Sequence, residues 1–332
     1  MTAAGEAAAV VVDGAAGGHV LGLDIGGTKL AAGVVDPEGR VLSFELESTL
    51  AKEGPERGLA RLFDLGRRAV AAAGVDWSRI TIVGIGAGGP LDAGRGVLIA
   101  PPHLPGWRHV PLTALAEEAF GVPAALENDA TAAAAGEHRY GAGNGTQHMV
   151  YLTISTGVGG GVVIDGRLYR GASGNGGELG HVTVDWNGRP CRGCGRRGCL
   201  EAYVSGTSIA ERAREAGMEE VATASEVAAA AAAGDPVAGE VWRATTDALA
   251  CGLTSIVNLF EPELVVLGGG VVSGAGEQLL GPVRQRVRAE AMPPAAARLE
   301  IVPAALGDRV GVVGAAAIAY ERAASGDVRT HG

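Results

Sequence analysis

The hydrophobic pattern predicts three strands at the start of the chain, followed by alternating helices and strands. Apolar runs over 19–24 and 29–36 lie on either side of an Ile-Gly-Gly-Thr turn, and a third run, 40–45, follows Pro-Glu-Gly. The apolar residues then change to helical spacing over 55–73. The remaining segments of this half are a strand at 80–86, a helix at 111–120, a strand at 122–126 and a helix at 129–140. The predicted order is β-β-β-α-β-α-β-α.

A second copy of this order follows, interrupted by a glycine- and cysteine-rich insertion and several helices. Its expected elements are strands at 147–155, 159–165, 263–267 and 299–302, and helices at 277–289 and 311–322. Two copies of one β-rich unit predict an α/β protein with two similar lobes around a cleft. Ligands bind where the turns and helix N-termini of such sheets meet.

Composition narrows the class of protein. The chain has 332 residues, of which 47% are apolar, so it can bury large cores without a disulfide framework. Lys and Arg number 27 against 37 Asp and Glu, and this net charge of −10 disfavours general binding to nucleic acid or anionic membranes. No Lys or Arg precedes Lys29, so residues 1–18 are expected to be a flexible extension rather than a secretory signal.

Two glycine turns point to phosphate binding. The first comprises Asp24, Ile25, Gly26, Gly27, Thr28 and Lys29. Backbone N–H groups in such a turn can approach phosphate oxygens closely, and Asp24 can hold the water shell of Mg²⁺. Thr156 and Gly157 lie in the equivalent turn of the second copy. The alternative, a plain hairpin turn with a solvated aspartate, weakens because both copies carry the motif.

A third glycine run, Gly268–Gly270, follows a Val-Val-Leu strand and leaves room for a flat base or ribose, although a simple strand-to-helix turn explains it equally well. Neither lysine follows a glycine, so the chain has no Walker A motif. The first strand leads into a hairpin rather than a Rossmann glycine turn. A nucleotide site in this protein must therefore be of another type.

The segment Glu127-Asn128-Asp129 lies between a predicted strand and a predicted helix. Asn and Asp are favoured helix N-caps, which is one explanation for the motif. The other is that Asp129 acts as a general base towards a hydroxyl group while Asn128 orients it. On that interpretation Asp24 and Asp129 divide the metal and proton functions.

One histidine and three cysteines lie close together in the insertion. His181, Cys191, Cys194 and Cys199 have the composition of a closed tetrahedral zinc site, which leaves no open position for catalysis, so we expect a structural Zn²⁺. Three clustered thiols suit a metal better than disulfides and fit the reducing cytoplasm, with free thiols as the alternative. Cys251 is expected to be a buried apolar residue.

Two glutamates, Glu178 and Glu201, lie on either side of the predicted zinc ligands. If the metal fixes this loop over the cleft, both carboxylates can accept hydrogen bonds from a polyol. The sequence therefore places a sugar-like ligand beside the metal.

These motifs together resemble the ROK family of repressors and sugar kinases, over about residues 19–322. The resemblance implies the two-lobed actin/hexokinase-like (ribonuclease H-like) fold. It implies a smaller lobe of 19–127 with 307–326, and a larger lobe of 128–306 that carries a zinc knuckle at 181–199. Within the family the chain is most similar to bacterial ATP-dependent glucokinases. The activity implied is Mg²⁺-assisted transfer of the ATP γ-phosphate to the 6-hydroxyl of glucose.

The resemblance also implies a role for each matching residue. Asp129 resembles the base that takes the proton from the sugar 6-hydroxyl. The sugar-binding set comprises Gly88, Gly89, Asn128, Asp129, Glu178, His181 and Glu201. The ATP-binding set comprises Asp24, Gly26, Gly27, Thr28, Lys29, Thr156, Gly157, Gly268, Gly269 and Gly270.

The knuckle departs from the family pattern by one residue. The family has Cys-x-Cys-Gly-x-x-Gly-Cys, whereas Arg192 occupies the position of the first cysteine here and Cys191 lies one residue earlier. We expect Cys191 still to bind the metal, because a glycine-rich loop accommodates one extra residue easily.

Two alternatives compete with a glucokinase. A sugar-sensing repressor needs a DNA-binding module of roughly 60–80 residues, but the 18 residues before the first strand carry no positive charge. No nucleic-acid or membrane partner is therefore expected. The other alternative keeps the kinase and changes the sugar, to N-acetylmannosamine, N-acetylglucosamine or fructose, or changes the phosphate donor to polyphosphate. The resemblance implies a homodimer or homotetramer.

Overall fold

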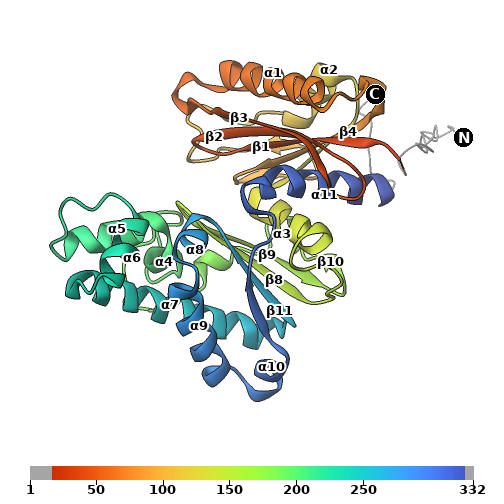
Figure 1. The fold of residues 1–332 in the computed structure, drawn as a ribbon. Helices are drawn as coiled ribbons and strands as arrows, with labels where there is room; N and C mark the ends of the chain where they lie inside the picture. The colour runs from red at the N-terminus through yellow and green to blue at the C-terminus, as the bar shows by residue number, and fades with distance from the viewer. Residues whose placement is uncertain (1–16, 326–332) are drawn as a thin grey trace, which may run out of the picture.

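The protein folds into two lobes, each built around a five-stranded sheet (Figure 1). The computed structural model describes residues 17–325, so residues 1–16 of the predicted extension lie outside the described part. None of the helices in this part is long and apolar enough to cross a bilayer.

The two sheets have the same strand order. In the first lobe the strands lie side by side as β3 (Val41–Ser48), β2 (Lys29–Val35), β1 (His19–Ile25), β4 (Ile80–Ala87) and β7 (Ala124–Asn128). In the second they lie as β10 (Arg167–Leu168), β9 (Val158–Ile164), β8 (Met149–Ile154), β11 (Leu264–Gly268) and β12 (Glu300–Pro303). In both, the first three strands are antiparallel and the last two run parallel to the central strand. The predicted two-lobed architecture with a duplicated unit is confirmed.

Helices cover both faces of each sheet. The outer face of the first sheet carries α1 (Pro55–Ala73) and α2 (Leu112–Phe120). Two helices lie between the sheets, α11 (Val310–Ser325) on the first and α3 (Asp129–Tyr140) on the second. The far face of the second sheet shares one hydrophobic core with α4 (Glu201–Val204), α5 (Gly206–Glu215), α6 (Ala224–Ala232), α7 (Pro236–Phe260), α8 (Gly270–Ala275), α9 (Glu277–Glu290) and α10 (Pro293–Arg298).

The predicted elements correspond closely to those observed. The helices predicted at 55–73 and 129–140 begin and end at those residues. The pattern missed the hairpin of β5 (Leu91–Asp92) and β6 (Val97–Leu98), because strands of two residues show no alternation. Short 3₁₀ helices complete the described part of the chain: η1 (Ala51–Glu53), η2 (Trp77–Arg79), η3 (Leu179–His181) and η4 (Gly307–Arg309).

The two lobes meet where α3 crosses α11. A Cβ atom at Gly136 of α3 would lie 3.0 Å from the Cα of Gly314 on α11, and one at Gly314 would lie 2.4 Å from the carbonyl oxygen of Ala132. Both helices are rich in alanine, so their backbones can approach more closely than in a helix pair with larger side chains.

A row of glycines lets α11 lie equally close to its own sheet. Gly33, Gly22 and Gly84 are adjacent in register on β2, β1 and β4. A Cβ atom at Gly84 would lie 2.0 Å from the carbonyl oxygen of Ala315, and one at Gly22 would lie 2.4 Å from that of Val312. These contacts are with backbone, so a larger residue can be accommodated only if the helix moves.

We predict that Gly84→Ala destabilises the protein. The added methyl group overlaps the α11 backbone, and overpacking of a rigid core typically costs about 1–3 kcal/mol. Urea unfolding should show a lower midpoint than for the unmodified chain.

Gly239→Ala is the matched control, because Gly239 lies within α7 and a Cβ atom there would have no neighbouring atom within 4 Å. Removing a helical glycine there should leave stability unchanged or raise it by up to about 1 kcal/mol. Equal midpoints for the two variants would contradict the proposed close packing.

Candidate active site and metal cluster

Two aspartates meet at one edge of the first sheet. Asp24 on β1 is in register with Gly86 on β4, which is in turn in register with Glu127 on β7. The three strands are parallel, so their carboxyl ends lie together. A Cβ atom at Gly86 would be 3.5 Å from Oδ1 of Asp24 and 3.9 Å from the Cα of Asp129. Asp24 and Asp129, to which the sequence analysis assigned metal binding and proton transfer, are therefore neighbours in the structure.

The surroundings of these carboxylates favour their protonated forms. Burial, and then the negative charge of Asp129, raise the pKa of Asp24 from 3.8 to about 7. Asp129 is partly accessible to solvent. The surrounding protein nevertheless desolvates its carboxyl group and raises its pKa as well. The N–H of Ala130 and the positive charge of His103 oppose that rise. A cation bound beside Asp24 would instead lower the pKa of Asp24.

The side chain of Asn128 caps α3 with its oxygen and directs its NH₂ group away from the helix. Its Oδ1 accepts hydrogen bonds from the backbone N–H groups of Ala130 (3.0 Å) and Thr131 (3.1 Å), as the helix-cap explanation requires. Its Nδ2 lies 3.8 Å from where a Cβ atom of Gly89 would be, so the amide N–H groups face the Gly88-Gly89 turn. Cap and ligand-binding residue are therefore compatible roles for one side chain.

The first glycine turn is held in a tight conformation. The N–H of Gly26 donates to the carbonyl of Lys29 (2.9 Å), and the hydroxyl of Thr49 donates to the carbonyl of Gly26 (2.6 Å). Thr28 and Lys29 are exposed at this turn. Their exposure leaves the side chains free to reach an anion.

The second glycine turn borders a cavity of about 390 Å³. The N–H of Ser155 donates to the carbonyl of Gly157 (2.9 Å), and the hydroxyl of Thr207 on α5 donates to the carbonyl of Thr156 (3.0 Å). The lining comes from this turn and from α5, α6, α7 and α8, and includes Thr156, Thr207, Arg214, Ser225, Trp242 and Gly270. The cavity has the size and mixed lining expected for a small organic ligand.

The third glycine run divides into two kinds of position. Gly270 lines the cavity and begins α8. Gly268 and Gly269 allow close packing instead, since a Cβ atom would lie 2.8 Å from the Tyr151 hydroxyl at Gly268 and 2.3 Å from the Ile154 carbonyl oxygen at Gly269. Close packing between strand and helix thus accounts for glycine at these two positions, and nucleotide binding by their backbone stays a prediction.

The sequence pattern gave no role to His103, which the structure places inside the site. A Cβ atom at Gly27 would lie 2.9 Å from the Cβ of His103, and one at Gly88 would lie 2.3 Å from its Cε1. The imidazole thus sits between the first glycine turn and the Gly88-Gly89 turn. Its loop, Pro-Pro-His-Leu-Pro-Gly-Trp, has no periodicity, and the available signal was the presence of a histidine between prolines.

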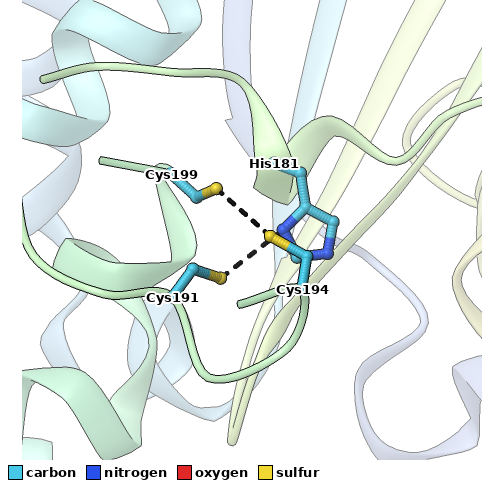
Figure 2. Close-up of side chains that lie close together, drawn as sticks. All are labelled: His181, Cys191, Cys194 and Cys199. Carbon is cyan, nitrogen blue, oxygen red and sulfur yellow. Dashed lines mark hydrogen bonds between the residues drawn. The ribbon is translucent and has the colours of Figure 1, made fainter. Parts of the chain in front are cut away.

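The four predicted metal ligands converge (Figure 2). The ligand atoms of His181, Cys191, Cys194 and Cys199 all lie within 4.8 Å of one another. The Sγ of Cys191 is 3.6 Å from Nδ1 of His181, and the Sγ atoms of Cys194 and Cys199 are 3.5 Å apart. Ligand atoms around a tetrahedral zinc ion are about 3.5–3.8 Å apart, given Zn–S and Zn–N bonds of ~2.3 and ~2.0 Å. The donor set and its spacing therefore fit Zn²⁺, with Cys191 in place despite the shifted spacing.

The two glutamates beside the cluster have different surroundings. Glu178 is exposed, and its Oε2 lies 4.0 Å from Nε2 of His181, on the opposite side of the ring from the sulfur atoms. Glu201 lies between the cluster and the second glycine turn, because its Oε2 accepts the N–H of Val158 (3.0 Å) and its Oε1 is 3.3 Å from the Sγ of Cys191. Glu201 thus links the metal cluster to the second glycine turn.

Comparisons with known proteins identify the family of this chain. The ROK family profile matches residues 20–322. A glucokinase of Thermotoga maritima is 39% identical over 316 residues, which cover 91% of this chain and 98% of that protein. The crystal structure of a ROK hexokinase from Thermus thermophilus is 41% identical with a TM-score of 0.80, covering 92% of this chain and 99% of that one. A ROK family glucokinase from Streptomyces griseus, in complex with glucose and AMPPNP, is 37% identical with a TM-score of 0.76, covering 92% and 100%. This chain belongs to the ROK family.

Proposed function

We propose that the protein is an ATP-dependent glucokinase, which transfers the γ-phosphate of ATP to the 6-hydroxyl of glucose. The observation that carries this proposal is the pairing of Asp24 and Asp129 at one sheet edge, beside a glycine turn and a capping Asn128. The similarity to glucokinases of Thermotoga maritima and Streptomyces griseus supports the choice of substrates.

In the proposed mechanism Asp129 is the general base. Its carboxylate takes the proton from the sugar 6-hydroxyl as that oxygen attacks the γ-phosphorus in line. The pKa of Asp129, raised by desolvation, makes it a stronger base than an ordinary carboxylate. The Asn128 amide, Glu178 and Nε2 of His181 would hold the other hydroxyls, which fixes the attacking oxygen and reduces the entropic part of the barrier.

The nucleotide would lie between the two glycine turns, with its base in the cavity of about 390 Å³. The turn at Gly26–Thr28 and the turn at Thr156-Gly157 would direct N–H and hydroxyl groups at the phosphates. Asp24 would hold Mg²⁺ through its water shell, and the ion would supply neutralisation of phosphate charge. His103 would lie beside Asp129 and lower its pKa.

The metal cluster would have a structural role. Zn²⁺ bound by His181 and the three cysteines would fix the ring of His181, so that Nε2 stays directed at the sugar. Glu201 would be held against the second glycine turn by the N–H of Val158. Loss of the metal should then weaken the sugar site.

Three further proposals follow from the family resemblance. The lobes divide at 19–127 with 307–326 and at 128–306, and each sheet is built mainly from one of these parts. The chain assembles as a homodimer or homotetramer. It works in the cytoplasm, where a reducing environment keeps the cluster thiols as metal ligands.

The first prediction concerns the base. Asp129→Asn should retain glucose binding but lose at least ~10² in turnover, because the amide cannot accept the proton. Coupled detection of ADP release with Mg-ATP and a panel of hexoses and N-acetylhexosamines measures it. Asp165→Asn, the same change at an exposed hairpin residue, should behave as wild type.

Turnover by Asp129→Asn near the wild-type rate would refute the base assignment. Turnover of another sugar in preference to glucose would keep the kinase and correct the substrate. If the wild-type protein released no ADP with any sugar of the panel, the proposed function would be refuted.

The second prediction concerns pH. The acid limb of kcat/KM should lie above the ordinary aspartate pKa of 3.8, because Asp129 must be ionised and desolvation raises its pKa. His103→Gln removes a neighbouring positive charge, so the pKa of Asp129 should rise further and the limb should move to higher pH. His148→Gln, at an exposed histidine beside Asp165, is the control. An acid limb shared by all three proteins would contradict the proposed electrostatic contact.

The third prediction concerns the metal. Purified protein should contain about one Zn²⁺ per chain by elemental analysis, and Cys194→Ser should lose it, bind glucose more weakly and unfold at lower temperature. Cys251→Ser, at the fourth cysteine and outside the cluster, should keep the metal. Wild-type protein without stoichiometric zinc would refute the structural role.

A further inference from the structure

Arg170 connects the two lobes through two carboxylates. It lies two residues beyond β10, in the second lobe. Its Nε donates to Oε2 of Glu127 on β7 (2.8 Å), and its Nη1 and Nη2 donate to the two carboxylate oxygens of Glu321 on α11 (3.0 and 3.2 Å). Both carboxylates belong to elements of the first lobe. The carboxylates raise the pKa of Arg170 in spite of its desolvation, so it is charged.

Glu127 connects Arg170 to the candidate active site. Its side chain is fully buried, and Arg170 is the cation bound to it. A buried charge is costly unless it is paired, so Arg170 determines where the Glu127 carboxylate can lie. The other oxygen of Glu127 accepts the backbone N–H of Asn128 (3.1 Å). Arg170 is thereby linked through one residue to the segment that carries Asn128 and Asp129.

On its other side, Arg170 anchors the loop that leads to Glu178. The carbonyl of Arg170 accepts the N–H of Gly176 (2.8 Å), which closes the loop 171–176. Gly171, Ala172 and Ser173 are exposed, and 171–174 borders a cavity of about 670 Å³. Packing therefore contributes little to this loop, and the anchors at Arg170 hold it.

We propose that Arg170 is a positioning residue that holds the loop carrying Glu178 in register with the Asn128-Asp129 segment at the end of β7. The proposal rests on the proposed function for its kinetic consequences. Three N–H groups of one planar guanidinium contact two carboxylates, an arrangement that the single ammonium of lysine cannot reproduce. Arg170 thus acts through Glu127 and through its own loop, without touching the reacting atoms.

The kinetic test compares Arg170→Met and Arg170→Lys with Arg286→Met. Arg286 pairs Asp247 on α7 and Glu290 on α9, so its substitution also removes an inter-helix ion pair, at a distance from the site. We expect both Arg170 variants to lower kcat/KM for glucose by about 10–100-fold while KM for ATP stays within about twofold, because the sugar groups alone lose their alignment. Arg286→Met should match wild type.

A double variant separates positioning from general stability. If Arg170 acts through Glu127, Arg170→Met combined with Glu127→Gln should lose no more activity than Arg170→Met alone, because the stranded charge is removed. The proposal would be overturned if the losses of the two substitutions multiplied in the double variant. It would also be overturned if both Arg170 variants had wild-type kinetics, or if they lost kcat/KM equally towards glucose and ATP.

Hydrogen exchange provides a readout that does not depend on turnover. In Arg170→Met, amides of 171–178 and 128–131 should exchange faster than in wild type, while those of α7 and α9 should not change. Uniform acceleration, or none, would overturn the proposal. A wild-type chain inactive towards glucose would refute the proposed function instead, and the exchange result would still decide the role of Arg170.

Discussion

The close crossing of α3 and α11 is the contact on which the two-lobed structure depends. Gly136 and Gly314 bring the two helix backbones together, and the glycine row Gly33-Gly22-Gly84 brings α11 equally close to its sheet. Both helices also begin at the site: α3 starts with Asp129, and a Cβ atom at Gly311 of α11 would lie 2.3 Å from the Asp24 carboxylate. The same small residues that join the lobes therefore bring the two carboxylates together.

That arrangement has an electrostatic cost which serves the proposed reaction. Burial and the neighbouring negative charge of Asp129 disfavour ionisation of Asp24, and its pKa rises to about 7. In the proposed mechanism a cation held by Asp24 would offset this repulsion, so that ionisation of Asp24 would be coupled to metal binding. His103 from the first lobe lowers the pKa of Asp129. The proposed reaction would thus couple the charge state of Asp24 to binding of the charged substrate.

Sequence patterns predicted the elements that have a clear period and the motifs that have a fixed composition. The duplicated strands, the helix at 129–140 and the ligands of the metal cluster follow from local sequence. His103 and Arg170 could not be found in this way, because each acts through contacts with residues distant in sequence or in other elements. The glycine run 268–270 shows the converse limit, since close packing at Gly268 and Gly269 explains these glycines without a ligand, and their place in the nucleotide site stays a prediction.

The segment from β10 to α4 is ordered although it has few apolar side chains to bury. Residues 171–177 are mostly small and exposed, and the knuckle at 191–199 contains three glycines among largely exposed residues. Such a chain loses much conformational entropy on ordering and gains little from hydrophobic burial. Arg170 at one end and the Cys₃His cluster at the other replace packing with a few strong, directional contacts. Glu178 lies between these two anchors and His181 belongs to the cluster itself. In the proposed function the groups that would contact the sugar are thus fixed from both sides, while the intervening backbone stays open to a ligand.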